Sequence, residues 1–178
     1  MVEPILFVLG PSGAGKTTLG QSLTTELGML HIDFDQWPEN GVDREGLRPE
    51  GEKFLAGNLQ SLADAIRKRM RAGTHCGAVV TCPSKLVLPR DLFAAAEPLG
   101  YRFIILYGTG AECLEGFLRG EHVARHGLSE DHWIDNNAWS YAVFSRSEFD
   151  DYRIAAFDTA GFRPRLEVLA EIEQRLVK

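Results

Sequence analysis

Short apolar runs alternate with amphipathic stretches along most of the chain. Residues 4–10 (PILFVLG), 30–35 (LHIDFD), 78–82 (AVVTC), 102–108 (RFIILYG) and 153–159 (RIAAFDT) have the length and composition of β-strands. The first run is continuously apolar, which is typical of a strand covered on both faces. The chain is therefore predicted to contain five strands.

The segments between these strands carry apolar residues at spacings of three or four, which predicts helices. We expect helices over about 16–28, 50–73, 89–96 and 111–119, and a last helix that begins at Pro164. The apolar positions of the long second helix are Leu55, Leu59, Leu62, Ile66 and Met70, and those of the last helix are Leu166, Leu169, Ile172 and Leu176.

Strands that alternate with helices predict a parallel α/β sheet with helices on both faces. Residues 36–49 lack periodicity and are expected to form a loop. Residues 120–152 are polar and weakly periodic, and a segment of this length inside a compact domain is typical of a lid or binding loop. We therefore expect one domain over residues 1–178, with a lid at about 120–152.

Composition and charge narrow the function classes. The formal net charge of −6 disfavours nucleic acid as a partner. No apolar run is long enough to cross a bilayer, and the first 20 residues lack the pattern of a signal peptide, so we expect a cytoplasmic protein. Cys76, Cys82 and Cys113 have unrelated spacings and are expected to be buried free thiols.

The segment from Gly10 to Thr17 (GPSGAGKT) matches the phosphate-binding motif G-x-x-x-x-G-K-[ST] at every fixed position. It follows an apolar strand and opens a helix, so backbone N–H groups and the helix N-terminus can surround phosphate oxygens. Lys16 is expected to reach the β- and γ-phosphates, and the Thr17 hydroxyl to ligate Mg²⁺. The predicted nucleotide contacts in this loop are Gly10, Pro11, Ser12, Gly13, Ala14, Gly15, Lys16, Thr17 and Thr18.

Two acids follow the second strand. Asp33 and Asp35 are two residues apart, which places them on one face of an extended segment. One of them can hold magnesium waters while the other accepts a proton from a hydroxyl nucleophile. The third strand ends in Thr81 and Cys82, without the acid that many phosphate-loop proteins carry at a later strand end.

The motifs GPSGAGKTT and HIDFD together resemble the shikimate kinase and gluconate kinase branch of the P-loop kinases, which is related to the nucleoside monophosphate kinases. The resemblance implies a P-loop NTPase fold with strand order 2-3-1-4-5 and a lid. It also implies ATP and Mg²⁺ as cofactors, with Asp33 at the metal and Asp35 at the acceptor hydroxyl.

The same resemblance suggests roles for residues outside these motifs. Lys85 and Arg90 would bind the acceptor. For Trp37 the sequence position decides instead: it lies two residues after Asp35, which favours a wall of the acceptor pocket over a small hydrophobic patch. Arg119 would lie over the adenine, and Arg125 would neutralise charge on the transferred phosphoryl group. The loop after the fifth strand contributes Gly161, Arg163 and Pro164 as further adenine contacts.

Other polar and aromatic residues of the lid region leave two readings open. Asn136, Asn137, Tyr141 and the neighbouring tryptophans Trp133 and Trp139 can close over an acceptor or dock a helix through a small hydrophobic patch. The histidines His122, His126 and His132 fit a polar lid better than a metal site.

The function predicted from these patterns is an ATP-dependent phosphotransferase with a small sugar acid or polyol as acceptor. We expect a monomer or homodimer. The alternatives are a non-catalytic ATP-binding module and a nucleoside or nucleotide kinase. A switch GTPase is disfavoured because the guanine-reading sequence Asn-Lys-x-Asp does not occur in the chain.

Overall fold

The computed structural model describes residues 2–34, 46–119, 130–159 and 161–176. These residues form two compact units, each assembled from segments that are distant in sequence. Unit one comprises Met1–Val8, Thr17–Cys82 and Leu88–Phe103, and unit two comprises Leu9–Lys16, Pro83–Val87 and Ile104–Lys178. No helix in the described ranges is both long enough and apolar enough to cross a bilayer.

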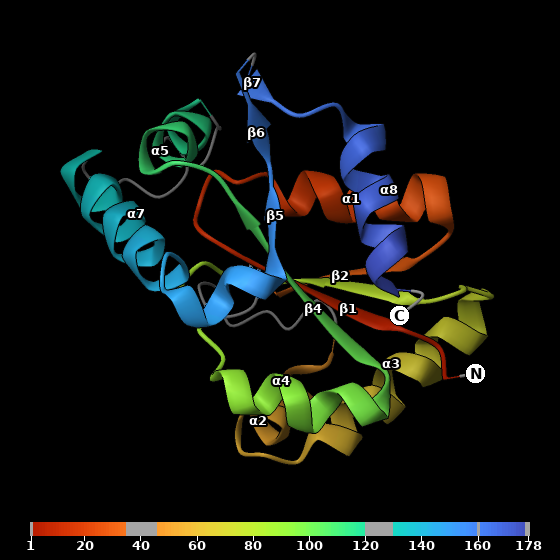
Figure 1. Cartoon of the computed structure of the whole chain (residues 1–178). Helices are drawn as coiled ribbons and strands as arrows, with labels where there is room; N and C mark the ends of the chain where they lie inside the picture. Colours follow the sequence, from red (N-terminus) through yellow and green to blue (C-terminus); the bar gives the residue numbers. More distant parts are fainter. Residues whose placement is uncertain (1, 35–45, 120–129, 160, 177–178) are drawn as a thin grey trace. The chain divides into compact units, whose positions relative to one another are not determined.

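The five predicted strands form one sheet in the expected order, β2-β3-β1-β4-β5 (Figure 1). Their bounds are β1 Ile5–Leu9, β2 Leu30–Asp33, β3 Ala78–Thr81, β4 Tyr101–Tyr107 and β5 Arg153–Ala155. The pairs β1–β3, β2–β3 and β4–β5 are parallel. Every residue of β1 and β3 is buried, which explains why β1 is apolar throughout and β3 is apolar up to Thr81, without alternation.

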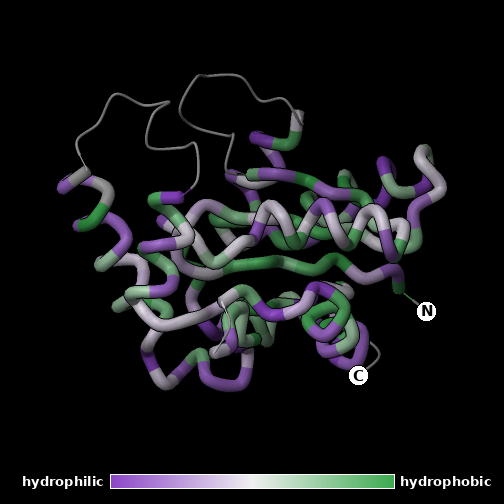
Figure 2. The backbone as a smooth tube through the Cα atoms, turned by 90° about the horizontal axis from the view of Figure 1, so that it is seen from above, coloured by the Kyte–Doolittle hydropathy of each residue, from purple (hydrophilic) through white to green (hydrophobic). Residues whose placement is uncertain are grey.

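Unit one has helices on both sides of its strands. Helix α1 (Lys16–Leu27) lies on one side, and α2 (Arg48–Leu55), α3 (Leu59–Gly73) and α4 (Arg90–Ala96), with the short 3₁₀ helix η2 (Glu97–Leu99), lie on the other (Figure 1). Figure 2 shows the resulting pattern, with hydrophobic strands and helices that alternate between hydrophilic and hydrophobic positions.

Aromatic rings fill the core on the side of α2 to α4. Phe7 of β1 stacks on Phe54 of α2 with ring centroids 5.3 Å apart, and Phe93 of α4 stacks on Phe103 of β4 at 4.1 Å. Tyr101 is fully buried among these rings, and its hydroxyl donates a hydrogen bond to the carbonyl of Leu59 at 2.9 Å. Burial raises the pKa of this phenol far above its ordinary value.

The single long helix expected over residues 50–73 is wrong, because the chain forms α2 and α3 instead. Gly57 has φ of 94°, a left-handed conformation that interrupts the helix. Asn58 then caps α3 by accepting a hydrogen bond from the amide of Ser61 at 3.4 Å. The apolar spacing spans both helices because both pack on the same core, but Leu55 is exposed.

Unit two contains α5 (Gly110–Leu118), α7 (Glu130–Phe144), the 3₁₀ helix η3 (Ser147–Tyr152) and α8 (Arg165–Leu176). Helices α5 and α7 pack against each other, and α8 packs against β5. In the region expected to be a lid, residues 130–144 are thus a regular helix, and residues 120–129 lie outside the described ranges.

The fifth predicted strand is shorter than expected. Strand β5 ends at Ala155, and Phe157–Asp158 (β6) pairs antiparallel with Gly161–Phe162 (β7) in a separate small sheet. The stacked rings of Phe157 and Phe162, 4.4 Å apart, stabilise this hairpin.

The prediction of the apolar face of α8 is also wrong in one position. Leu166 is 71% exposed, and the buried residues are Val168, Leu169 and Ile172. Because α8 begins at Arg165, Leu166 lies in its first turn, outside the buried stripe.

All three cysteines are free, as predicted. Cys82 and Cys113 are buried, but Cys76 is exposed, so the expectation of three buried thiols is wrong for this residue. Cys76 lies just before β3, in the connection from α3, and its thiol donates a hydrogen bond to the carbonyl of Leu27 at 2.8 Å.

Candidate nucleotide-binding site

The loop from Gly10 to Gly15 joins β1 to α1 and is shaped by glycines that no other residue could replace without strain. Gly10, Gly13 and Gly15 have φ of 136°, 81° and 86°. A Cβ atom at Gly10 would lie 2.2 Å from the carbonyl oxygen of Leu106 in β4, and one at Gly13 would lie 1.9 Å from that of Cys113 in α5. The loop is therefore packed tightly against the backbone of β4 and α5, within unit two.

The side chain of Lys16 lies against this loop. It is only 6% exposed, and its ammonium donates hydrogen bonds of 3.0 Å to the carbonyls of both Gly10 and Pro11. A buried ammonium requires such partners, because an uncompensated charge in the interior is costly. The loop thus holds the predicted phosphate-binding cation beside its own backbone.

Ser12, in the middle of the loop, has partners in two other parts of unit two. Its hydroxyl donates to the hydroxyl of Ser84, after β3, at 2.7 Å, and its carbonyl accepts a hydrogen bond from the side-chain amide of Asn137 in α7 at 3.0 Å. Sequence reasoning assigned no role to Ser84 and left Asn137 with two readings. No local pattern could have found these contacts, since they join segments 72 and 125 residues apart.

Asp33 ends β2 and has a defined partner in unit one. In the sheet register, Asp33 of β2 pairs with Thr81 of β3, and Thr81 pairs with Val8 of β1. The fully buried Thr81 hydroxyl donates a hydrogen bond to Oδ1 of Asp33 at 3.2 Å. The register thus places Asp33 level with Val8, which is two residues before Gly10 in the chain.

His31 completes this arrangement. Its Nε2 lies 2.9 Å from Oγ1 of Thr81. Since the Thr81 hydroxyl donates its hydrogen bond to Asp33, the Thr81 oxygen accepts a hydrogen bond from His31. This requires the His31 tautomer that is protonated at Nε2. Burial lowers the pKa of His31 below its ordinary value, and the neighbouring Asp33 carboxylate opposes that shift.

Helix α1 contains a glycine that makes room for this histidine. A Cβ atom at Gly20 would lie 2.4 Å from Nε2 of His31. Glycine has a low helix propensity, and its presence at position 20 is explained by the close approach of α1 and β2 there.

Several predicted residues lie outside the described ranges, namely Asp35, Trp37 and Arg125, together with His122 and His126. The proposed metal contacts Thr17 and Asp33 are described, and both are half-buried. Their hydroxyl and carboxylate oxygens are ligand types that suit Mg²⁺. Within the described ranges, no group of three or more His, Cys, Asp or Glu side chains is placed to hold a metal.

The remaining predicted cations have different environments. Lys85 and Arg90 are exposed, Lys85 in unit two and Arg90 at the start of α4 in unit one. Arg119 is exposed and forms an ion pair with Glu115, one turn earlier in α5. Arg163 donates to the carbonyl of Ala155 at 2.9 Å and to Glu171 at 3.1 Å, so it links the end of β5 to the middle of α8.

The strand order and the glycine-shaped loop between β1 and α1 define a P-loop kinase fold. Residues 5–114 match the family described as AAA domain, and the chain belongs to that family.

Curated relatives, among them two shikimate kinases, match part of the chain. Shikimate kinase 2 of Escherichia coli O81 (strain ED1a) is 29% identical over 92 residues, which cover 49% of this chain and 43% of that protein. Shikimate kinase 2 of Escherichia fergusonii is 45% identical over 42 residues, which cover 24% of this chain and 23% of that protein. The chain thus spans less than half the length of these relatives.

Solved structures are similar over nearly the whole chain. A gluconokinase from Sinorhizobium meliloti 1021 has a TM-score of 0.54 at 17% identity and covers 99% of this chain and 93% of its own. A shikimate kinase from Acinetobacter baumannii in complex with shikimate has a TM-score of 0.57 at 17% identity and covers 98% and 93%. At this identity the similarity shows the shared fold.

Proposed function

We propose that the protein is an ATP-dependent kinase that transfers the γ-phosphoryl group to a hydroxyl of a small sugar acid or polyol. The observation that carries this proposal is the loop of Gly10 to Gly15 with the buried Lys16 ammonium held against it. A loop of this kind, at the start of a helix, suits the phosphates of a nucleotide.

In this proposal Lys16 and the loop bind and orient the phosphates of ATP, and Arg125 adds positive charge during transfer. Thr17 and Asp33 would hold Mg²⁺, which neutralises phosphate charge when bound. Thr81 keeps the Asp33 carboxylate in place through its hydrogen bond. Asp35 would take the proton from the acceptor hydroxyl. Arg119, Arg163 and Pro164 would contact the adenine.

The proposed acceptor class draws on the names of the similar proteins, a gluconokinase and shikimate kinases. Gluconate and shikimate, after which these proteins are named, are hydroxylated carboxylic acids. The exposed cations Lys85 and Arg90 suit an anionic acceptor of this kind. Trp37 would form one wall of the acceptor pocket.

Release of ADP in the presence of ATP, Mg²⁺ and a panel of sugar acids and polyols tests the proposal. One compound should stimulate ADP release, and the Lys16→Met variant should lose that stimulation together with tight ATP binding. Asp35→Asn should lose phosphoryl transfer and keep ATP binding, because this residue acts on the acceptor.

Other outcomes would support the alternatives. ATP binding without stimulation by any compound in a panel that also includes nucleosides and nucleotides would favour a non-catalytic ATP-binding module. Stimulation by a nucleoside or nucleotide alone would move the acceptor to that class. Full transfer activity in Asp35→Asn would remove Asp35 as the base.

A further inference from the structure

Helix α7 presents polar side chains on its buried face. Asn137 is 2% exposed, and Ser140, one turn later, is completely buried. Ser140 satisfies its hydroxyl within the helix by donating to the carbonyl of Asn137 at 2.9 Å. Asn137 instead directs its amide out of the helix to the carbonyl of Ser12. A buried amide is costly without a partner, so this contact with the loop accounts for an asparagine at this position.

The contact fixes one peptide plane of the loop. The peptide between Ser12 and Gly13 is trans, so the N–H of Gly13 points away from the carbonyl of Ser12. Asn137 holds that carbonyl toward α7, and the Gly13 N–H is therefore aimed in the opposite direction. Gly13 has φ of 81°, a conformation that permits this orientation, and the bond from Ser12 to Ser84 restrains the same residue.

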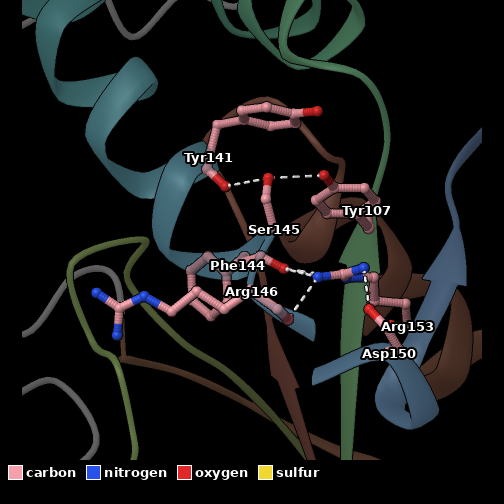
Figure 3. A network of polar contacts seen from close by, with 7 residues as sticks. All are labelled: Tyr107, Tyr141, Phe144, Ser145, Arg146, Asp150 and Arg153. Atoms are coloured by element: carbon pink, nitrogen blue, oxygen red, sulfur yellow. Dashed lines mark hydrogen bonds and ion pairs between the residues drawn. The ribbon is translucent and has the colours of Figure 1, made fainter. Parts of the chain in front are cut away.

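Helix α7 is itself held firmly at its C-terminal end (Figure 3). Arg153 donates to the carbonyl of Phe144 at 2.8 and 3.0 Å and to that of Arg146 at 2.7 Å. An arginine at this end satisfies terminal carbonyls and complements the negative end of the helix dipole.

A second set of contacts joins the same end of α7 to β4. The hydroxyl of Tyr107 in β4 lies 2.8 Å from that of Ser145, which also donates to the carbonyl of Tyr141 at 2.7 Å (Figure 3). The rings of Tyr107 and Tyr141 stack with centroids 5.5 Å apart. Asn137 is therefore presented by an anchored helix.

We propose that Asn137 is a positioning residue of the phosphate site, which holds the Ser12–Gly13 peptide so that the Gly13 N–H is available to a phosphate oxygen. This inference rests on the proposed function, because it requires that the loop binds phosphate. It assigns to α7 a share in phosphate binding through the loop, without contact with the nucleotide.

The test uses Asn137→Asp in the full chain, with pyrophosphate and Mg²⁺·ADP as probes in calorimetry. The variant keeps the side chain's shape, but it loses the donor and turns a carboxylate oxygen toward the carbonyl of Ser12. We expect both affinities to fall about tenfold, which corresponds to about 1.4 kcal/mol. The KM for ATP should rise by a similar factor while the KM for the acceptor stays unchanged.

Ser145→Ala is the matched control. It removes the hydroxyl that joins α7 to Tyr107 and leaves Asn137 in place. We expect lower thermal stability and unchanged pyrophosphate affinity. If Ser145→Ala and Asn137→Asp lower the affinity equally, Asn137 acts only through the stability of α7 and the inference is overturned.

The remaining outcomes separate the two proposals. A wild-type protein that binds neither pyrophosphate nor ADP overturns the proposed function and this inference together. A wild type that binds both, with an Asn137→Asp variant that binds equally well, overturns only the role of Asn137. If Asn137→Asp does not fold, Asn137→Ala replaces it, and the amide chemical shift of Gly13 should then change relative to wild type. An unchanged shift would contradict the inference.

Discussion

Thr81 donates a hydrogen bond to Asp33 from the neighbouring strand, with 3.2 Å between the hydroxyl and Oδ1. The two residues are register partners at the ends of β3 and β2. Strand β3 does not end in an acid. Here the end of β3 contributes instead a hydroxyl that orients the acid of the adjacent strand.

We expect Thr81→Val to lower the free energy of unfolding by about 1–2 kcal/mol. Valine has nearly the same shape, but it leaves Nε2 of His31 and Oδ1 of Asp33 without this partner. Urea denaturation measures the change. Thr25→Val, at an exposed position of α1, is the control and should change stability by less than about 0.5 kcal/mol. Equal stability of wild type and Thr81→Val would contradict this prediction.

Gly13→Ala should destabilise the protein by about 3 kcal/mol or more. The new Cβ atom would lie 1.9 Å from the carbonyl oxygen of Cys113 and 2.5 Å from the amide nitrogen of Phe117, in addition to its strained φ. Gly28 has φ of 68°, but a Cβ atom added there would meet nothing within 4 Å, so Gly28→Ala should cost about 1 kcal/mol. Thermal unfolding of the two variants compares the costs. Similar losses would mean that the loop can move away from α5.

The start of α5 is a capping box that positions the helix against Gly13. Thr109 accepts a hydrogen bond from the amide of Glu112 at 3.2 Å, and the Glu112 carboxylate accepts one from the amide of Thr109 at 2.7 Å. Thr109→Ala should cost about 1 kcal/mol, and Thr109→Ser should retain most of that stability because it keeps the oxygen. Chemical denaturation tests both. A serine variant as unstable as the alanine variant would assign the loss to the methyl group.

The Cys113 thiol should make the stability depend on pH above about 9. Burial raises its pKa from 9.0 to about 11, while a backbone hydrogen bond at Gly108 and the charge of Lys16 oppose the shift. Between these values the unfolded chain loses the proton and the folded chain keeps it, so stability falls as pH rises. Urea midpoints from pH 8 to pH 10 should fall less steeply in Cys113→Ala than in wild type. Parallel slopes would contradict this prediction.

The five strands and the phosphate loop were predictable because both depend on local signals, whereas the strand order was implied only by the resemblance to the shikimate and gluconate kinase branch. Strands of continuous apolar residues, helical spacing between them and the GPSGAGKTT segment are read directly from the sequence. The break at Gly57 was missed because the leucine spacing continues across it, although the Gly57–Asn58 pair was a visible signal for a new helix. Phe157 reads as part of one strand over residues 153–159, so its antiparallel pairing with Phe162, outside that run, was missed.

The contacts that support the site were beyond sequence reasoning. Ser84 and Asn137 reach Ser12 from distant segments, and their residue types carry no signal until the fold brings them together. In the sequence, Thr81 stood out only because the third strand ends there without an acid. Its hydrogen bond to Asp33 depends on the register between β2 and β3, which apolar periodicity does not determine.

The imidazole of His31 occupies the space that a side chain at position 20 would need, so the residue at each position limits the size of the other. In any relative that keeps histidine at this point of the second strand, we expect the facing position of the first helix to remain without a side chain. A relative with alanine there should carry a smaller residue in the strand. The two positions, 11 residues apart in the sequence, should then change together across the family.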